Sequence, residues 1–322
     1  ICALLFEEAF MALVIPKETY SGKIYNVQLG TGAKAVTIGG ASALPFLGFE
    51  GTFPNKPAVA LEVMDIAPDD WPDTLKKAIG GAGSSAVQWA KFCQQNGADV
   101  VALRLMGTHP DQKNKSAEEA AKVAAEVAAA IDIPLVILGS GHVEKDTQVL
   151  QAAATATRGK NCAIGKAVEE NYKTVAAAAM ANDHKLIAMS QLDVNLAKQL
   201  NILLTQMGFD KERIIMDPMS SALGYGLEYT YSVMERIRLA ALLQNDPMMQ
   251  TPIICDIGAN VWKVKETMAP DAEVPEWGGL EDRALAWEAV TATAMLTAGA
   301  DMLIMRHPGA AAKAKEIIAE LM

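Results

Sequence analysis

The strongest constraint on the fold is a repeated alternation between short apolar runs and longer amphipathic stretches. The runs are rich in aliphatic and β-branched residues, and eight of them follow one another from residue 58 onward. They lie at residues 58–65, 100–105, 134–139, 162–165, 185–190, 213–217, 252–258 and 301–306. Short runs that are apolar on both faces are typical of strands buried on both sides of a parallel sheet.

The stretches between the runs carry helix start and stop signals. Ser116 is followed three residues later by Glu119, which is the signature of a capping box. Asp193 and Gly208 bracket a second helical pattern, and Gly299 follows another. A strand and a helix repeated eight times predict an α/β fold of the (β/α)8 TIM-barrel type. The alternative is a doubly wound open sheet, whose first strand is usually followed by a glycine-rich phosphate turn, and residues 64–70 (MDIAPDD) are not such a turn.

The segment before the first barrel strand has a different pattern. Residues 23–40 read as two strands joined at residues 30–32, which predicts a β-hairpin with a tight turn. The chain is therefore predicted to consist of an N-terminal extension with a hairpin (residues 1–57) and a barrel (residues 58–322). We expect the hairpin to cover the N-terminal end of the barrel. Residues 1–10 are expected to be dispensable, because Met11 is a more natural start.

Composition excludes several classes of function. The chain has 28 Lys and Arg residues against 38 Asp and Glu residues, a net charge of −10, which disfavours binding to a nucleic-acid backbone. No run of 18 apolar residues is present, so no membrane span is predicted. The four cysteines (Cys2, Cys93, Cys162 and Cys255) form no CxxC pair, so neither a disulfide framework nor a local iron–sulfur or zinc site is expected. This cysteine usage fits a reducing, cytoplasmic location.

In a TIM barrel the functional residues lie at the C-terminal ends of the strands and on the loops that follow them. The candidates here are Ser190, Asn195, Ser220, Gly224, Tyr225, Gly226, Asn260, Arg306 and His307. Most strand-end groups are neutral hydrogen-bonding or small residues, which suit a broad ligand rich in amides better than a metal or a phosphate. For the two glycines, an ordinary role in a tight turn explains the residue as well as a binding role does. For His307, a role at the start of the last helix does the same.

Other reaction classes lack their signatures. No metal-ligand spacing and no GxSxG nucleophile elbow is visible. The fourth strand is predicted to end at Gly165, and no lysine ends a predicted strand, since the nearest candidate, Lys145, lies on a loop. This absence of a lysine counts against a Schiff-base lyase or aldolase.

Several segments together resemble a known family. They include residues 61–73 (LEVMDIAPDDWPD), 217–242 (DPMSSALGYGLEYTYSVMERIRLAAL), 287–296 (WEAVTATAML) and 305–308 (MRHP). From about residue 24 to residue 322, the chain resembles the small subunit of the corrinoid iron–sulfur protein, which is also called the delta subunit of acetyl-CoA decarbonylase/synthase.

The resemblance implies a function in the reductive acetyl-CoA (Wood–Ljungdahl) pathway. The chain would be a non-catalytic barrel paired with a large subunit that carries the [4Fe–4S] cluster. Cobalamin would lie between the two subunits, over the mouth of the barrel. It would carry a methyl group from methyltetrahydrofolate methyltransferase to acetyl-CoA synthase/CO dehydrogenase. The polar candidates above are expected to contact the corrin, and none of the four histidines lies in a cobalt-ligating DxHxxG motif.

A second resemblance leaves an alternative open. Residues 214–226 (IIMDPMSSALGYG) are similar to the DPGxGFxK strand end of pterin-binding barrels, which would imply a self-contained, pterin-dependent methyltransferase. In this chain the turn is followed by Leu227 and Glu228 instead of a lysine, which counts against retained pterin binding.

Overall fold

The computed structural model describes residues 14–322, so the expectation for residues 1–10 lies outside the described residues. Eight parallel strands form one sheet, each at a predicted run. The strands are β3 (Ala58–Met64), β4 (Val100–Arg104), β5 (Leu135–Leu138), β6 (Ala163–Ala167), β7 (Lys185–Met189), β8 (Ile214–Asp217), β9 (Ile254–Asp256) and β10 (Met302–Met305). The predicted (β/α)8 barrel is confirmed.

The order of the strands shows how the barrel closes. Neighbouring strands follow the order β8-β7-β6-β5-β4-β3-β10-β9, so β3 pairs with both β4 and β10. The last two neighbours, β8 and β9, meet at a single isolated bridge between Met216 and Ile253. We refer to this junction as the β8–β9 seam.

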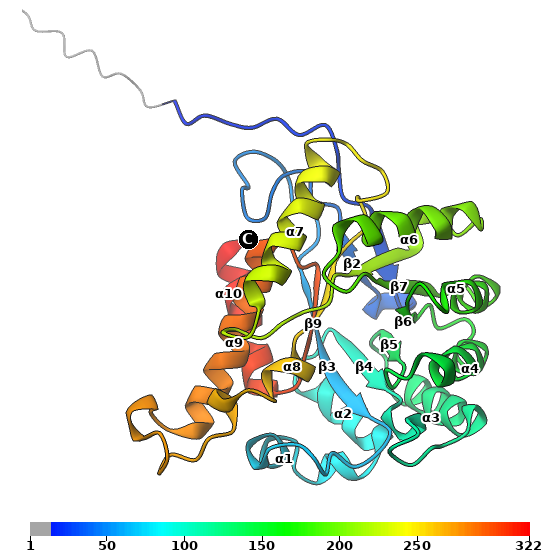
Figure 1. Cartoon of the computed structure of the whole chain (residues 1–322), viewed down its shortest axis with the longest axis vertical. Helices are drawn as coiled ribbons and strands as arrows, with labels where there is room; N and C mark the ends of the chain where they lie inside the picture. Colours follow the sequence, from blue (N-terminus) through cyan, green and yellow to red (C-terminus); the bar gives the residue numbers. More distant parts are fainter. Residues whose placement is uncertain (1–13) are drawn as a thin grey trace, which may run out of the picture.

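Helices surround the strands (Figure 1). In that view α3 to α6 line one side of the barrel, and α9 and α10 cover the other. The helices are α1 (Asp73–Ile79), α2 (Ala86–Gln95), α3 (Ala117–Ala130), α4 (Val143–Ala156), α5 (Tyr172–Ala181), α6 (Val194–Gln206), α7 (Leu227–Leu242), α8 (Gly258–Val261), α9 (Leu280–Ala298) and α10 (Pro308–Leu321). No helix among residues 14–322 is long and apolar enough to cross a membrane.

The predicted helix signals have the expected geometry. Ser116 and Glu119 form a complete capping box at the start of α3. The carboxylate of Asp193 accepts backbone N–H groups at the start of α6, and Gly299 ends α9 in a left-handed conformation. These caps satisfy N–H and C=O groups that a helix end otherwise leaves without partners.

The N-terminal hairpin closes the N-terminal end of the barrel interior. Strands β1 (Asn26–Leu29) and β2 (Val36–Gly39) pair antiparallel, and Val27, Leu29 and Ile38 pack into the same apolar cluster as the inward residues of the barrel strands. The connection between β1 and β2 is longer than the predicted tight turn, because a short 3₁₀ turn at Gly32–Lys34 lies within it. The hairpin thus occupies the end opposite the C-terminal mouth, as predicted.

Candidate functional site

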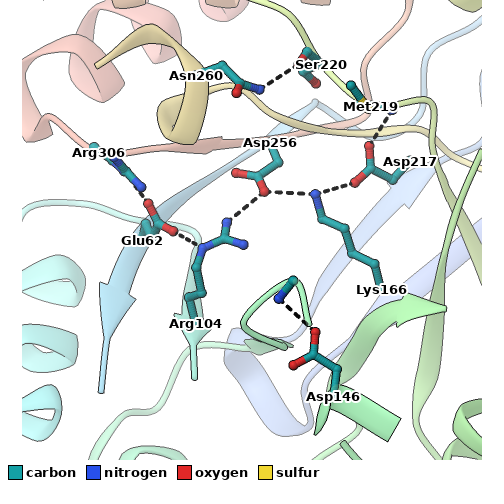
Figure 2. A network of polar contacts seen from close by, with 11 residues as sticks. Glu62, Arg104, Asp146, Lys166, Asp217, Met219, Ser220, Asp256, Asn260 and Arg306 are labelled. Carbon is teal, nitrogen blue, oxygen red and sulfur yellow. Dashed lines mark hydrogen bonds and ion pairs between the residues drawn. The ribbon is translucent and has the colours of Figure 1, made fainter. Parts of the chain in front are cut away.

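A layer of charged side chains lies directly above the apolar interior of the barrel. Alternate residues of a strand face the barrel centre. On β3, Ala58 and Ala60 belong to the apolar interior and Glu62 is the next residue on that face; Arg104 follows in the same way on β4. Figure 2 shows the six residues of what we call the charged layer: Glu62, Arg104, Lys166, Asp217, Asp256 and Arg306.

One half of the charged layer is built around Glu62. This carboxylate is buried and accepts hydrogen bonds from Nε of Arg104 and Nε of Arg306, one on each oxygen. The guanidinium of Arg306 also stacks on the indole ring of Trp71, 4.5 Å from the ring centroid. One carboxylate on β3 therefore holds two cations, Arg104 at the end of β4 and Arg306 directly after β10, the two strands that flank β3.

The other half is built around Lys166. Its Nζ lies 2.8 Å from Oδ2 of Asp217 and 2.9 Å from Oδ2 of Asp256. Nη2 of Arg104 donates to the same Asp256 oxygen at 2.7 Å and so joins the two halves. Asp217 lies on β8 and Asp256 on β9, so Lys166 contacts both strands of the β8–β9 seam.

The charged layer is electrically balanced, with three cations and three carboxylates. Burial by itself would raise the pKa of Asp256. The positive charges of Arg104 and Lys166 have the larger effect and hold this pKa well below its usual range. Burial would lower the pKa of Lys166, but Asp217 and Asp256 outweigh it and raise this pKa above its ordinary value. Lys166 and Asp256 are therefore both ionised at neutral pH.

The prediction that no lysine ends a strand is wrong. Strand β6 does not stop at Gly165 but continues to Ala167, and the pairing with β7 shifts register between Ile164 and Ala167. Lys166 therefore enters the mouth of the barrel. Because two carboxylates keep it protonated, it lacks the free amine that a Schiff-base mechanism needs.

The expectation of mostly neutral strand-end groups is also wrong. The side chains that reach the barrel centre are the inward-facing ones, and the six that form the layer are all charged. Of the nine predicted site residues, Arg306 alone belongs to the charged layer.

Five predicted residues, Ser220, Gly224, Tyr225, Gly226 and Asn260, lie on the loop after β8 or directly against it. Nδ2 of Asn260, in α8, donates to the carbonyl oxygen of Ser220 at 2.6 Å (Figure 2). The hydroxyl of Tyr225 donates to Glu266 at 3.0 Å, and the ring is half exposed. Gly224 and Gly226 have φ angles of +78° and +93°, a region that favours glycine, and Gly226 starts α7.

The other three predicted residues have different surroundings. Ser190 is buried, and its backbone N–H donates to the carbonyl of Asp217 at 3.0 Å. Asn195 is exposed in the first turn of α6. His307 caps α10 through Nδ1, which accepts from the backbone N–H of Gly309, and its ring stacks on Trp262. Burial lowers the pKa of His307, so the ring is neutral near pH 7.

A buried glutamate that the sequence reasoning missed supports the turn after β10. Glu288, in α9, is completely buried, and its two oxygens accept the backbone N–H groups of Arg306 at 2.7 Å and His307 at 3.0 Å. Burial raises the pKa of Glu288 to about 7. The signal in the sequence was a single carboxylate inside the otherwise uncharged segment 287–296.

A second carboxylate shapes the loop after β5. Asp146 accepts the backbone N–H groups of Ser140 at 2.7 Å and Gly141 at 2.8 Å. A Cβ atom on Gly139 would lie 2.3 Å from the carboxylate carbon, so this close approach requires glycine. Among residues 14–322, no group of three or more His, Cys, Asp or Glu side chains is arranged to hold a metal ion.

Comparison with known families shows which family this chain belongs to. A family model described as the CO dehydrogenase/acetyl-CoA synthase delta subunit matches residues 26–320. The chain belongs to this family. The resemblance found in the sequence is thereby confirmed.

Relatives in the delta subunit family support the assignment. The acetyl-CoA decarbonylase/synthase complex subunit delta of Methanothermobacter thermautotrophicus is 38% identical over 305 residues, which cover 94% of this chain and 77% of the relative. Subunit delta 2 of Methanosarcina acetivorans is 38% identical over 294 residues, 89% of this chain. The match spans 66% of the length of that Methanosarcina relative.

Solved structures share the fold. Dihydropteroate synthase of Xanthomonas albilineans superposes with a TM-score of 0.57 at 15% identity, covering 92% of this chain and 98% of the synthase. The synthase of Vibrio fischeri gives the same TM-score at 13% identity, covering 84% and 95%. At this level of identity the likeness shows a common barrel architecture.

Proposed function

We propose that this delta-family chain is the small subunit of a heterodimeric corrinoid iron–sulfur methyl carrier in the reductive acetyl-CoA pathway. Its role would be to help hold cobalamin over the C-terminal mouth of the barrel. Membership of the delta subunit family over residues 26–320 is the observation that carries the proposal.

The proposal assigns the iron–sulfur cluster to a partner. Cys93, Cys162 and Cys255 are free and buried in separate elements, and burial raises the pKa of each thiol, so they offer no joint thiolate set to a [4Fe–4S] cluster. The cluster would belong to the large subunit. The further partners would be methyltetrahydrofolate methyltransferase and acetyl-CoA synthase/CO dehydrogenase, in the cytoplasm, where reduced thiols persist.

The mouth of the barrel fits a broad and nearly neutral ligand. Its charges already balance one another, so a ligand lying across it needs no net charge of its own. Met219 and Tyr225 add exposed apolar surface on the loop after β8, with 39% and 50% of their area accessible. A corrin ring with carboxamides along its rim matches such a surface. We propose that it is contacted by Ser190, Asn195, Ser220, Gly224, Tyr225, Gly226, Asn260, Arg306 and His307.

Bound cobalamin would supply the cobalt centre that carries the methyl group. The residues of this chain would cover one face of the ring, exclude water from it and fix its orientation through hydrogen bonds. Each such hydrogen bond contributes about 0.5–1.5 kcal/mol net, so this chain alone would hold cobalamin weakly. A second subunit that covers the other face adds about 25 cal/mol for each Å² of apolar surface buried.

The alternative is a self-contained, pterin-dependent methyltransferase. In that case Asp217 would have to bind a pterin ring. Here its Oδ1 accepts the backbone N–H of Met219 at 2.8 Å and its Oδ2 pairs with Lys166 at 2.8 Å, so both oxygens already have a contact within the chain. The geometry favours the methyl-carrier subunit.

Equilibrium dialysis with hydroxocobalamin tests the proposal. We expect the absorption of bound corrinoid with the reconstituted heterodimer and much weaker binding with the isolated chain. Micromolar or tighter binding by the isolated chain would contradict a shared site. A parallel titration of the isolated chain with methyltetrahydrofolate should show no binding, and saturable binding would favour the alternative.

A further inference from the structure

Arg104 is anchored at two of its three guanidinium nitrogens. Nε donates to Glu62 and Nη2 donates to Asp256. Nη1 has no partner among residues 14–322, and it is not sealed away from solvent. A guanidinium fixed in this way presents one N–H-bearing nitrogen to the mouth without needing to reorganise.

Arg306 is anchored more firmly and leaves two nitrogens unused. Nε donates to Glu62, the guanidinium lies over the ring of Trp71, and the backbone N–H donates to Glu288. Its Nη1 and Nη2 have no partner within the described part of the chain, and neither is sealed from solvent. Both arginines are held by Glu62, so the two guanidinium groups lie against the same carboxylate.

The unused N–H groups of the two arginines favour an oxygen acceptor. Two guanidiniums share the carboxylate of Glu62, and Arg104 also pairs with Asp256. Lys166 pairs with Asp217 and Asp256. The layer as a whole is neutral, so a ligand that adds a full charge would leave that charge uncompensated in a largely buried site.

A carboxamide supplies an oxygen acceptor without adding a charge to the layer. A carboxylate supplies the same acceptor together with a full negative charge. The neutral layer therefore favours a carboxamide.

We propose that Arg104 and Arg306 form a clamp for the carbonyl oxygen of a carboxamide on the ligand of the barrel mouth. The identity of that ligand rests on the proposed function, in which the carboxamides belong to the rim of the corrin. Glu62 and Trp71 are positioning residues, which act by fixing the two guanidinium planes. A carboxylate has the same oxygen acceptor but carries a charge, and the experiment separates the two groups.

The first arm of the test does not depend on a corrinoid. Crystals of the chain, grown without carboxylates, are soaked in acetamide or in acetate. We expect acetamide to place its oxygen on the unused nitrogens of Arg104 and Arg306. Water alone at these nitrogens in both soaks would overturn the clamp. Binding of acetate without binding of acetamide would overturn its selectivity for a carboxamide.

The second arm measures the affinity of the heterodimer for hydroxocobalamin by equilibrium dialysis. Arg104→Lys and Arg306→Lys keep the charge that pairs with Glu62 but lose the planar fork, and each should weaken binding about tenfold or more. Arg236→Lys, an exposed arginine on α7, is the matched control and should leave binding unchanged. Equal affinities for all variants with unaltered melting temperatures would overturn the clamp. If the wild-type heterodimer binds no corrinoid, the proposed function fails, and the acetamide soak alone decides on the clamp.

Discussion

Lys166 on β6 and Asp217 on β8 are paired, with 2.8 Å between Nζ and Oδ2, although β7 separates their strands. The pair lies in the layer where the apolar interior of the barrel gives way to its mouth. Asp217 has no exposed surface, and Lys166 is largely covered. The ammonium and the carboxylate therefore depend on each other in an environment where an unpaired charge is costly.

Replacing Lys166 by methionine should be strongly destabilising. The substitution leaves the carboxylate of Asp217 without its cation and removes one of the two cations that hold Asp256. Loss of one partner from a buried ion pair typically costs about 3–5 kcal/mol, and we expect a decrease of that size in the free energy of unfolding, measured with urea. Lys160→Met, at an exposed position, is the control and should change little. Equal effects of the two substitutions would contradict this prediction.

The stability of the chain should depend on pH through Glu288. Burial raises its pKa in the folded chain to about 7, above its ordinary value near 4.5. The folded state therefore binds more protons than the unfolded state between these values, and stability falls as the pH rises from about 4.5 to about 7. The loss is about 3 kcal/mol at most.

Glu288→Gln should remove this contribution, because the amide does not titrate. Urea unfolding at a series of pH values measures the effect. The variant should show a flatter profile than the wild type between pH 5 and pH 7. Parallel profiles for the two proteins would show that Glu288 does not titrate in this range.

The hairpin should contribute to stability through its inward side chains. Leu29 is completely buried against the barrel interior, so Leu29→Ala should cost about 2–5 kcal/mol. Its neighbour Gln28 is exposed, and Gln28→Ala should be nearly neutral. Deletion of the hairpin should uncover the barrel interior and increase the binding of an apolar dye. Unchanged stability and solubility after that deletion would show that the barrel does not need this cover.

Gly139→Ala should disturb the loop after β5. The added Cβ would lie 2.3 Å from the carboxylate carbon of Asp146, so either the carboxylate or the backbone has to move. Overpacking of this kind typically costs about 1–3 kcal/mol. Gly81→Ala, where a Cβ would meet nothing within 4 Å, is the control. The melting temperatures of the two variants measure the effect. A decrease for Gly139→Ala that is no larger than the decrease for Gly81→Ala would contradict the close contact between Gly139 and Asp146.

Local patterns in the sequence predicted the scaffold well because each strand and helix is specified by its own residues. The apolar runs at 58–65 and 301–306 contain β3 and β10, and Ser116 and Asp193 begin the helices that their capping signals predicted. The hairpin and its position also followed from local pattern and chain order. These features need no knowledge of which strands become neighbours.

The charged layer was harder to predict because its partners are distant in sequence. Arg104 and Asp256 are 152 residues apart, and their contact depends on the closed order of the strands. Part of the signal was nevertheless present: Glu62 and Arg104 continue the two-residue spacing of the apolar residues before them. Lys166 gave no such signal, because β6 changes register with β7 immediately before it.

The single bridge at the β8–β9 seam has a mechanical consequence. The other neighbouring strands are joined by ladders of backbone hydrogen bonds, whereas β8 and β9 share one bridge and the ammonium of Lys166, which contacts Asp217 on one strand and Asp256 on the other. Backbone pairing therefore leaves the ring of strands nearly open between β8 and β9, and the ion pairs of Lys166 with Asp217 and Asp256 join the two strands. Loss of Lys166 would therefore leave this junction with its single backbone bridge and widen the ring first at the mouth.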